Sequence, residues 1–368
     1  MAEDFPSSHE EILKWQLSGG RTVGEVAQLL SAEGAYDEPD ERRVRRIKVK
    51  LNLKGREASL FPNELVSTAN EKTGLASIDL PPLATCPGAT SFCRERCYDI
   101  DLGRRRPQHF LREYQTYLEV KKRLDNPKEL ADWLSKLVEQ GIKEEEKLGI
   151  PRDKAIIRLH VGGDVFHENY AEALKEVARR FPEVHFYLYT HYDKAVEWLR
   201  DRPRNLRVNL SLDPANAKEF LSRPELLDAV DELTYILPDE AHLDEARRVV
   251  EEAKKRGKEA VIFLEKSRRS SLQRLVREKA RDLLPHVCPE ELGAETTCSV
   301  CRRCAVQPEK RWRATAEDPY VKLLRQKLLK EKEEEKSKAA AAPIVQMAPI
   351  IAAPEEEGER KVRVKIKV

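Results

Sequence analysis

The chain has 368 residues, and its 67 basic and 65 acidic residues nearly cancel, so no strong overall field attracts nucleic acid or an acidic membrane. Charged residues reach 36% and only two methionines occur, a composition typical of thermophilic proteins. No apolar run approaches the roughly 20 residues of a membrane span, and the acidic start MAEDF is unlike a signal peptide. We therefore expect a cytoplasmic protein with no membrane partner.

Residues 8–60 predict a small helical unit. HEEILKWQL is followed by a Gly-Gly break and then by RTVGEVAQLLSAEG, in which Thr22 and Glu25 have capping-box spacing. A basic stretch, ERRVRRIKVKLNLKGR, comes next. This order is similar to helix-turn-helix units. Two interpretations remain: a unit that contacts nucleic acid, or a packing appendage with an exposed basic strand.

The central region, residues 75–284, predicts one α/β domain. Six short apolar or β-branched runs predict strands at 76–80, 155–161, 184–190, 206–212, 232–237 and 259–265. Helical patterns separate these runs, as in repeated β-α units with a parallel sheet. Two further helices are expected at 108–123 and 127–147. Six such units favour a partial (β/α)6 barrel, with a doubly wound sheet as the alternative.

The remaining chain divides by composition. Residues 285–316 form a cysteine-rich module, 317–336 predict a highly charged helix, and 337–360 are biased to Ala and Pro, as in flexible linkers. Residues 361–368, KVRVKIKV, alternate basic and apolar side chains. They suit either an edge strand added to a sheet or a basic tail.

Three cysteines, Cys86, Cys93 and Cys97, follow the first predicted strand with C-x6-C-x3-C spacing. Barrels and open α/β sheets place active sites in loops at this end of their strands. Three thiolates could hold a [4Fe–4S] cluster that leaves one iron open, whereas structural zinc takes four ligands. His160 or His191 is the candidate for a fourth ligand, which would favour zinc or a closed cluster.

Four more cysteines gather near residue 300: Cys288, Cys298, Cys301 and Cys304. Their C-x2-C-x2-C triple, with a distant cysteine before a proline, follows the ligand logic of bacterial ferredoxins. Zinc sites more often pair two C-x2-C knuckles across a longer gap. We expect a second iron–sulfur cluster here, with zinc as the alternative, because a reducing cytoplasm disfavours disulfides.

Gly162, Gly163 and Asp164 end the second predicted strand. Together with the cysteine loop they resemble the radical S-adenosylmethionine (SAM) enzymes. That resemblance implies a partial barrel of six β-α units, a GGE-type motif that contacts the SAM amino group, and an auxiliary cluster on the C-terminal cysteines. The usual loop is C-x3-C-x2-C. Here Ile100 stands where its last cysteine would be, so Cys86 must be the third ligand, and Asp replaces the usual Glu.

A narrower resemblance covers roughly residues 75–305. The CPGAT–C–CY segment, the RLHVGGD strand and the terminal C–C–C group are similar to the phage "gene product 88" family. This family implies an architecture more securely than a reaction.

Polar residues follow several predicted strands: Asp164, Thr190, His191, Asp213 and Lys266. In a barrel they would face one cavity, although Asp or Thr at such a position is also a common helix cap. The basic run Arg104–Arg106 suits an anionic substrate, a nucleic-acid backbone or plain solvent exposure.

These patterns favour a radical SAM-like iron–sulfur enzyme that uses S-adenosyl-L-methionine and a reductant protein to generate a 5′-deoxyadenosyl radical. Its substrate and catalytic residues are not specified by the sequence. The alternative is a non-enzymatic nucleic-acid-binding protein with two structural cysteine sites. A third interpretation is an electron-transfer protein with two closed clusters.

Overall fold

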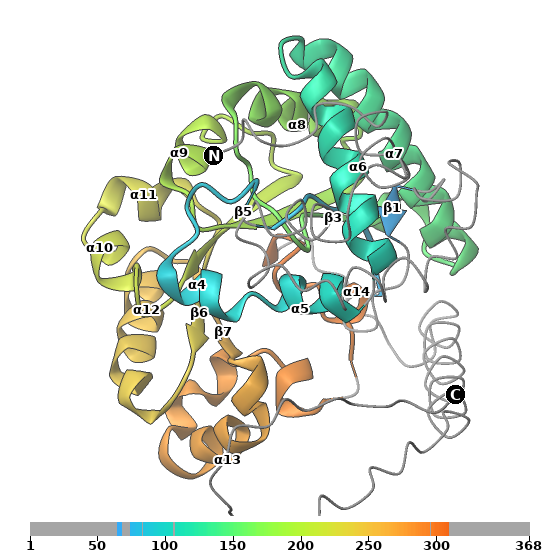
Figure 1. Cartoon of the computed structure of the whole chain (residues 1–368). Coiled ribbons are helices and arrows are strands. Elements are labelled where there is room, and N and C mark those ends of the chain that lie inside the picture. Colours follow the sequence, from blue (N-terminus) through green and yellow to red (C-terminus); the bar gives the residue numbers. More distant parts are fainter. Residues whose placement is uncertain (1–64, 68–73, 83, 106, 295, 309–368) are drawn as a thin grey trace, which may run out of the picture. The chain divides into compact units, whose positions relative to one another are not determined.

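The computed structural model describes residues 65–67, 74–82, 84–105, 107–294 and 296–308 (Figure 1). The N-terminal unit expected at 8–60 lies outside the described residues, as do the segments 317–336, 337–360 and 361–368. Among the described helices, none combines the length and the apolar character needed to cross a bilayer.

A seven-stranded sheet organises the described residues. Its strands are β1 (Val66–Ser67), β2 (Ala76–Ile78), β3 (Ile156–Leu159), β4 (His185–Thr190), β5 (Leu206–Leu212), β6 (Glu232–Leu237) and β7 (Glu259–Leu264). They lie side by side in chain order; β1 is antiparallel to β2, and all later neighbours are parallel. All six expected strands are present. The doubly wound alternative is wrong, because such a sheet reverses its strand order.

Helices connect the parallel strands. The α-helices are α4 (Ser91–Arg96), α5 (Tyr98–Arg105), α6 (Pro107–Arg123), α7 (Pro127–Lys147), α8 (Glu168–Arg180), α9 (Asp193–Trp198), α10 (Ala217–Leu221), α11 (Pro224–Ala229), α12 (Leu243–Lys255), α13 (Arg269–Lys279) and α14 (Cys298–Cys301). Short 3-10 helices are η2 (Arg152–Lys154), η3 (Glu240–His242), η4 (Lys266–Arg268), η5 (Arg281–His286) and η6 (Glu290–Leu292). The two long helices expected before β3 are thus confirmed as α6 and α7.

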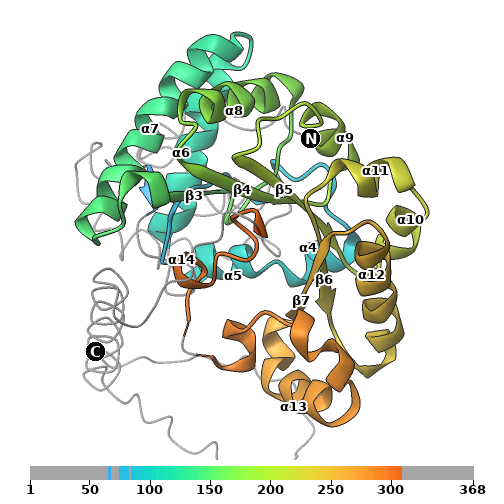
Figure 2. The ribbon, with the colours of Figure 1, turned by 180° about the vertical axis from the view of Figure 1, so that it is seen from behind.

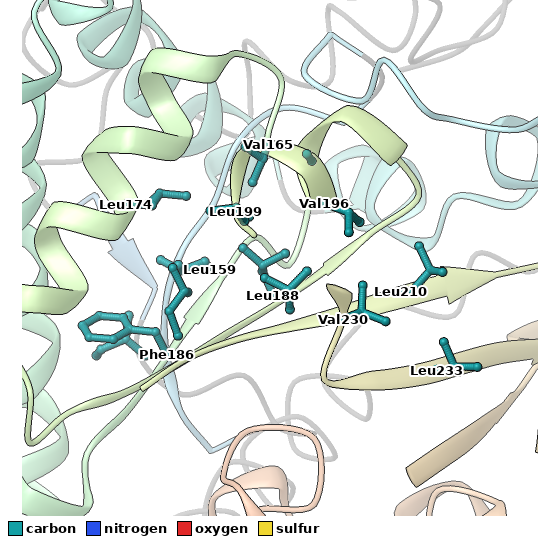
Figure 3. Packing of buried hydrophobic residues seen from close by; sticks show 14 of the residues in the cluster. Leu159, Val165, Leu174, Phe186, Leu188, Val196, Leu199, Leu210, Val230 and Leu233 are labelled. Atoms are coloured by element: carbon teal, nitrogen blue, oxygen red, sulfur yellow. The ribbon is translucent and has the colours of Figure 1, made fainter. Parts of the chain in front are cut away.

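One face of the sheet is apolar and covered by helices. Successive side chains of a strand point to opposite faces, so every second residue reaches this side. Figure 3 shows Leu159, Leu188, Leu210 and Leu233, from four neighbouring strands, within one packed cluster. That cluster also contains residues of α7, α8, α9 and α12. Its burial supplies the main apolar contribution to folding.

The opposite face is largely polar although it is buried. The residues that alternate with the apolar set include Tyr187, Asn209, Glu232 and Thr234, none more than 1% exposed. Strand alternation of this kind leaves one face free for a ligand or for covering chain. The apolar pattern of the strands alone did not predict how polar this face is.

The cysteine-rich segment covers part of the polar face. The Asn209 side-chain amide donates to the Cys304 carbonyl at 3.0 Å, and Leu75, Ile156 and Tyr187 pack against the chain at residues 305–306. Figure 2 shows α14 on the side of the sheet away from α8 and α9. Residues 298–306 therefore lie on the polar face of the sheet.

A buried carboxylate on α7 joins the first parallel strands. Glu145 accepts hydrogen bonds from the backbone N–H groups of Ala76 and Ile156, both at 3.0 Å. Burial raises the pKa of Glu145 to about 8, against the opposing effect of these two donors and of Arg302. The side chain thus links β2, β3 and α7 from within the core.

We expect Glu145→Gln to flatten the pH dependence of stability. An acid whose pKa is higher in the folded state binds its proton more tightly there than in the unfolded chain. Wild type should therefore lose stability relative to the variant as the pH rises from about 5 to 8. Urea denaturation at both pH values measures the difference. Glu146→Gln, at the exposed neighbouring position, is the control; equal slopes for wild type and Glu145→Gln would contradict the expectation.

Candidate functional site

The cysteine loop after β2 crosses the carboxyl ends of the parallel strands. Thr90 donates its hydroxyl to the Asp213 carboxylate at 2.5 Å, just after β5, and accepts from the Cys93 backbone N–H at 2.9 Å. Gly88 lies against the chain after β4, where an added Cβ would come within 2.5 Å of the His191 carbonyl oxygen. Thr90 therefore caps α4 and, through its bond to Asp213, holds Cys93 near the end of β5.

Contacts further along the loop reach the ends of β3 and β7. The Tyr98 hydroxyl donates to the Val161 carbonyl after β3, and Arg158 of β3 donates to the same hydroxyl at 3.2 Å. Arg96 lies 3.7 Å from the Glu265 carboxylate, just after β7. The path can be followed in cyan in Figure 1. The loop is thus held at the strand ends from β3 to β7.

The thiols of this loop lie among carboxylates. Burial, together with the charges of Asp213 and Asp164, raises the pKa of Cys93 to about 11. Burial raises the pKa of Cys97 to about 12, with added effects from Asp99 and from Cys93 itself. Cys93 and Cys97 are therefore electrostatic neighbours. Both remain thiols at neutral pH unless a cation replaces the proton.

Cys86 begins the turn that leads to these two residues. Its carbonyl oxygen accepts from the Ala89 N–H at 3.0 Å, and its side chain is partly buried. All seven cysteines lie in described residues, and all are free of disulfide bonds.

The GGD turn after β3 supports the start of the cysteine loop. The Gly162 carbonyl accepts from the Leu80 N–H, and the Asp164 N–H donates to the Thr85 carbonyl, both at 3.1 Å. Gly163 has a φ of 85°, and a Cβ there would lie 2.5 Å from the Leu80 Cβ. Glycine is therefore required at this position for both conformation and space.

The Asp164 side chain joins the ends of β3 and β4. It is 3% exposed and accepts from Val165 N–H at 2.7 Å, from the Thr190 hydroxyl at 3.0 Å and from His191 N–H at 3.1 Å. Burial raises the pKa of Asp164 to about 7, although these donors oppose the shift. Its charge also acts on Cys93. Asp164 is thus both a structural acceptor and a neighbour of the candidate metal site.

Other residues expected at the strand ends divide into two groups. The Nδ1 atom of His191 lies 3.7 Å from the carboxylate of Asp213, which also accepts from Thr90 of the cysteine loop, so His191 lies beside this loop. His160 instead bonds through Nε2 to the Tyr170 hydroxyl of α8 at 2.7 Å, and burial lowers its pKa to about 3. Lys266 is exposed at the start of η4. Of the two candidate fourth ligands, only His191 is placed beside the loop. The side chains of the Arg104–Arg106 run lie outside the described residues.

The second cysteine group gathers on the polar face. Burial raises the pKa of Cys304 well above its usual value, with further effects from the charges of Glu232, Cys298 and Cys288. Cys301 donates its N–H to the Thr297 carbonyl at 2.8 Å in the turn that carries the group. Three of these four sulfurs are therefore electrostatic neighbours.

Two tyrosines that the sequence analysis did not single out lie between the cysteine groups. The rings of Tyr187 and Tyr189 are 5.8 Å apart, and the Arg158 guanidinium lies 5.4 Å from the Tyr189 ring centre. Burial and then the charge of Cys298 raise the pKa of Tyr187. Arg158 also contacts Tyr98, which adjoins Cys97. The alternation HFYLYT was the available signal, because it places both tyrosines on one face.

A third group of chemically active residues was also missed. Among the described residues, Asp99, His109 and Glu113 form the group of three side chains whose ligand atoms all lie within 4.8 Å of one another. His109 and Glu113 stand four residues apart in the helix that was expected at 108–123, which places both on one helix face. That spacing was a signal in the sequence.

Comparison with known proteins identifies the family. The sequence model described as "Gene product 88" matches residues 51–307, more than half of the chain and all seven cysteines. The chain belongs to the gene product 88 family. It is similar to the Gene 88 protein of Mycobacterium phage L5, with 32% identity over 154 residues, and to that of Mycobacterium phage D29, with 31% identity over 154 residues.

Each of these alignments covers 40% of this chain and 61% of the relative, so the chain spans less than two thirds of the length of these curated relatives. No solved structure matches the chain. The narrower resemblance seen in the sequence is thus confirmed, whereas the comparisons do not support the wider one to radical SAM enzymes.

Thr90→Val should lower the free energy of unfolding by about 1–3 kcal/mol, because it removes a helix cap and leaves the buried Asp213 carboxylate without its hydroxyl donor. Thr90→Ser keeps the hydroxyl and is the matched control, expected within about 1 kcal/mol of wild type. Chemical denaturation measures both. A valine variant as stable as the serine variant would show that this bond does not hold the loop.

Proposed function

We propose that this gene product 88 family protein is an iron–sulfur enzyme of radical SAM type. Cys86, Cys93 and Cys97 would hold a [4Fe–4S] cluster with one open iron. The observation that carries the proposal is the course of the cysteine loop across the carboxyl ends of six parallel strands that follow one another in chain order. A partial (β/α)6 barrel has this winding, and barrel enzymes place their sites at this end of the strands.

The chemistry that such a cluster supplies when bound is one-electron reduction of SAM, which yields a 5′-deoxyadenosyl radical able to remove a hydrogen atom from a substrate. The chain's own part is to bind, orient and exclude water. Buried carboxylates supply the electrostatic basis for binding, since Asp164 and Asp213 both act on Cys93. Iron offsets their repulsion of the thiolate, and a SAM ammonium group at the open iron would lie in the same negative field.

The GGD turn contributes mainly through its backbone in this proposal. Gly162 and Gly163 hold the chain close to the cysteine loop, and Asp164 already accepts three hydrogen bonds. A carboxylate offers about four lone-pair positions, so one remains for an ammonium donor. We therefore assign Gly162, Gly163 and Asp164 to SAM binding, with Asp164 acting through its charge and that remaining position.

Cys288, Cys298, Cys301 and Cys304 would hold a second cluster. The C-x2-C-x2-C spacing of three of them, with a distant cysteine before a proline, favours a cluster over zinc. Arg158, Tyr187 and Tyr189, between the two groups, suit electron transfer from a reductant protein.

The test uses the full chain, purified and reconstituted without oxygen. We expect about two clusters per chain by iron, sulfide and absorption, with SAM binding and release of 5′-deoxyadenosine after reduction. Cys93→Ala should lower the content to about one cluster and abolish 5′-deoxyadenosine. Cys301→Ala is the matched variant: it should alter the second group and leave SAM binding intact.

Two results would overturn the proposal. One is a reconstituted protein that neither binds SAM nor releases 5′-deoxyadenosine. The other is zinc without sulfide in both cysteine groups, which, with salt-dependent binding to DNA or RNA, would instead favour the structural nucleic-acid-binding alternative.

A further inference from the structure

Asp99, His109 and Glu113 form a compact group beside the cysteine loop. The Nε2 atom of His109 lies 2.8 Å from Asp99 Oδ1 and 3.0 Å from Glu113 Oε1. His109 and Glu113 belong to α6, and Asp99 belongs to α5. Three ligand atoms from two helices thus converge on one point.

The carboxylates of this group are buried without enough donors. Asp99 and Glu113 are each 1% exposed. Asp99 Oδ2 and Glu113 Oε2 have no hydrogen-bond partner within the described part of the chain, and Glu113 Oε1 lies against His109 Nε2, which already bonds to Asp99. One imidazole nitrogen can donate a single N–H and supply at most one positive charge against two carboxylates. Buried charges of this kind are paired or coordinate metals, because leaving them bare is costly.

The surrounding backbone closes the group from one side. A Cβ added at Gly162 would lie 1.9 Å from Asp99 Oδ2 and 2.8 Å from Glu113 Oε1. The glycine therefore lets the backbone approach the carboxylates directly. Both carboxylates therefore lie directly against the backbone of Gly162, which shields them from solvent on that side.

We infer that Asp99, His109 and Glu113 bind one divalent first-row metal ion, of the Mn²⁺, Fe²⁺ or Zn²⁺ class, separately from both cysteine groups. Ligands at about 2.1 Å from one ion, at neighbouring positions, lie about 3.0–3.4 Å apart, close to the separations observed here. A divalent charge balances the two carboxylates when His109 is neutral. One imidazole nitrogen with two carboxylates suits these ions better than Mg²⁺ or Ca²⁺, which prefer oxygen ligands alone.

Mn²⁺ is the probe that separates this site from the cysteines, because soft thiolates do not favour it. After chelator treatment of the full chain, a titration followed by electron paramagnetic resonance should show about one bound Mn²⁺. The bound ion should show coupling to one imidazole nitrogen. Cys93→Ala should bind Mn²⁺ as wild type does, which makes the result independent of the iron–sulfur proposal.

Glu113→Gln and Asp99→Asn keep the side-chain shapes and should weaken Mn²⁺ binding at least about ten-fold. Glu119→Gln, which changes a partly exposed carboxylate of the same helix that pairs with Arg123, is the matched control and should bind normally. Mn²⁺ should raise the melting temperature of wild type and of this control, but not that of Glu113→Gln or Asp99→Asn.

Three outcomes would overturn the inference: no Mn²⁺ bound by wild type, bound Mn²⁺ without imidazole coupling, or unchanged Mn²⁺ affinity in Glu113→Gln. The first, together with a more stable Glu113→Gln protein, would mean that the two carboxyl groups share a proton instead. The imidazole coupling is measured on wild type, so the test does not depend on the variants being folded.

Discussion

Buried carboxylates at successive strand ends hold the cysteine loop on the sheet. Asp79, after β2, accepts from Val161 N–H at 2.7 Å, and Asp213, after β5, accepts from the Thr90 hydroxyl at 2.5 Å. Where a strand ends, backbone N–H groups lose their ladder partners and must find other acceptors. Carboxylates at these positions satisfy them and connect neighbouring strands and loops at the same time. The course of the cysteine loop depends on these bonds.

The same carboxylates give the carboxyl edge of the sheet a negative character. Burial and the charges of Asp213 and Asp164 raise the pKa of Cys93, and burial and the charge of Asp99 raise that of Cys97. The loop is therefore positioned by hydrogen bonds that its own thiolates oppose electrostatically. The metal cluster that we propose would resolve this conflict, because its positive iron would stabilise the thiolates and would itself be stabilised by the nearby carboxylates.

Local periodicity predicted much of the fold, because strand and helix patterns depend on neighbours in sequence. The six strands and the helices α6 and α7 follow directly from it. Local periodicity could not predict hydrogen bonds between residues that are far apart in the sequence. The Asn209 bond to the Cys304 carbonyl spans 95 residues, and the Arg302 bond to the Lys154 carbonyl, at 2.6 Å, spans 148. These bonds place the C-terminal cysteines on the polar face of the sheet. From composition alone, residues 285–316 were expected to be a module distinct from the α/β domain.

The GGD turn shows why a short motif needs its surroundings. Gly162 is required here by the carboxylates of Asp99 and Glu113, and Gly163 by its positive φ against Leu80. Both requirements arise within this chain and hold whether or not SAM binds. The resemblance of the turn to a GGE-type motif therefore carries less weight for SAM than the cysteine loop does. The turn does lie between the two candidate metal sites, because Gly162 contacts the Asp99 group and the charge of Asp164 acts on Cys93. A metal ion at each site would therefore stabilise the Gly162–Asp164 turn from both sides.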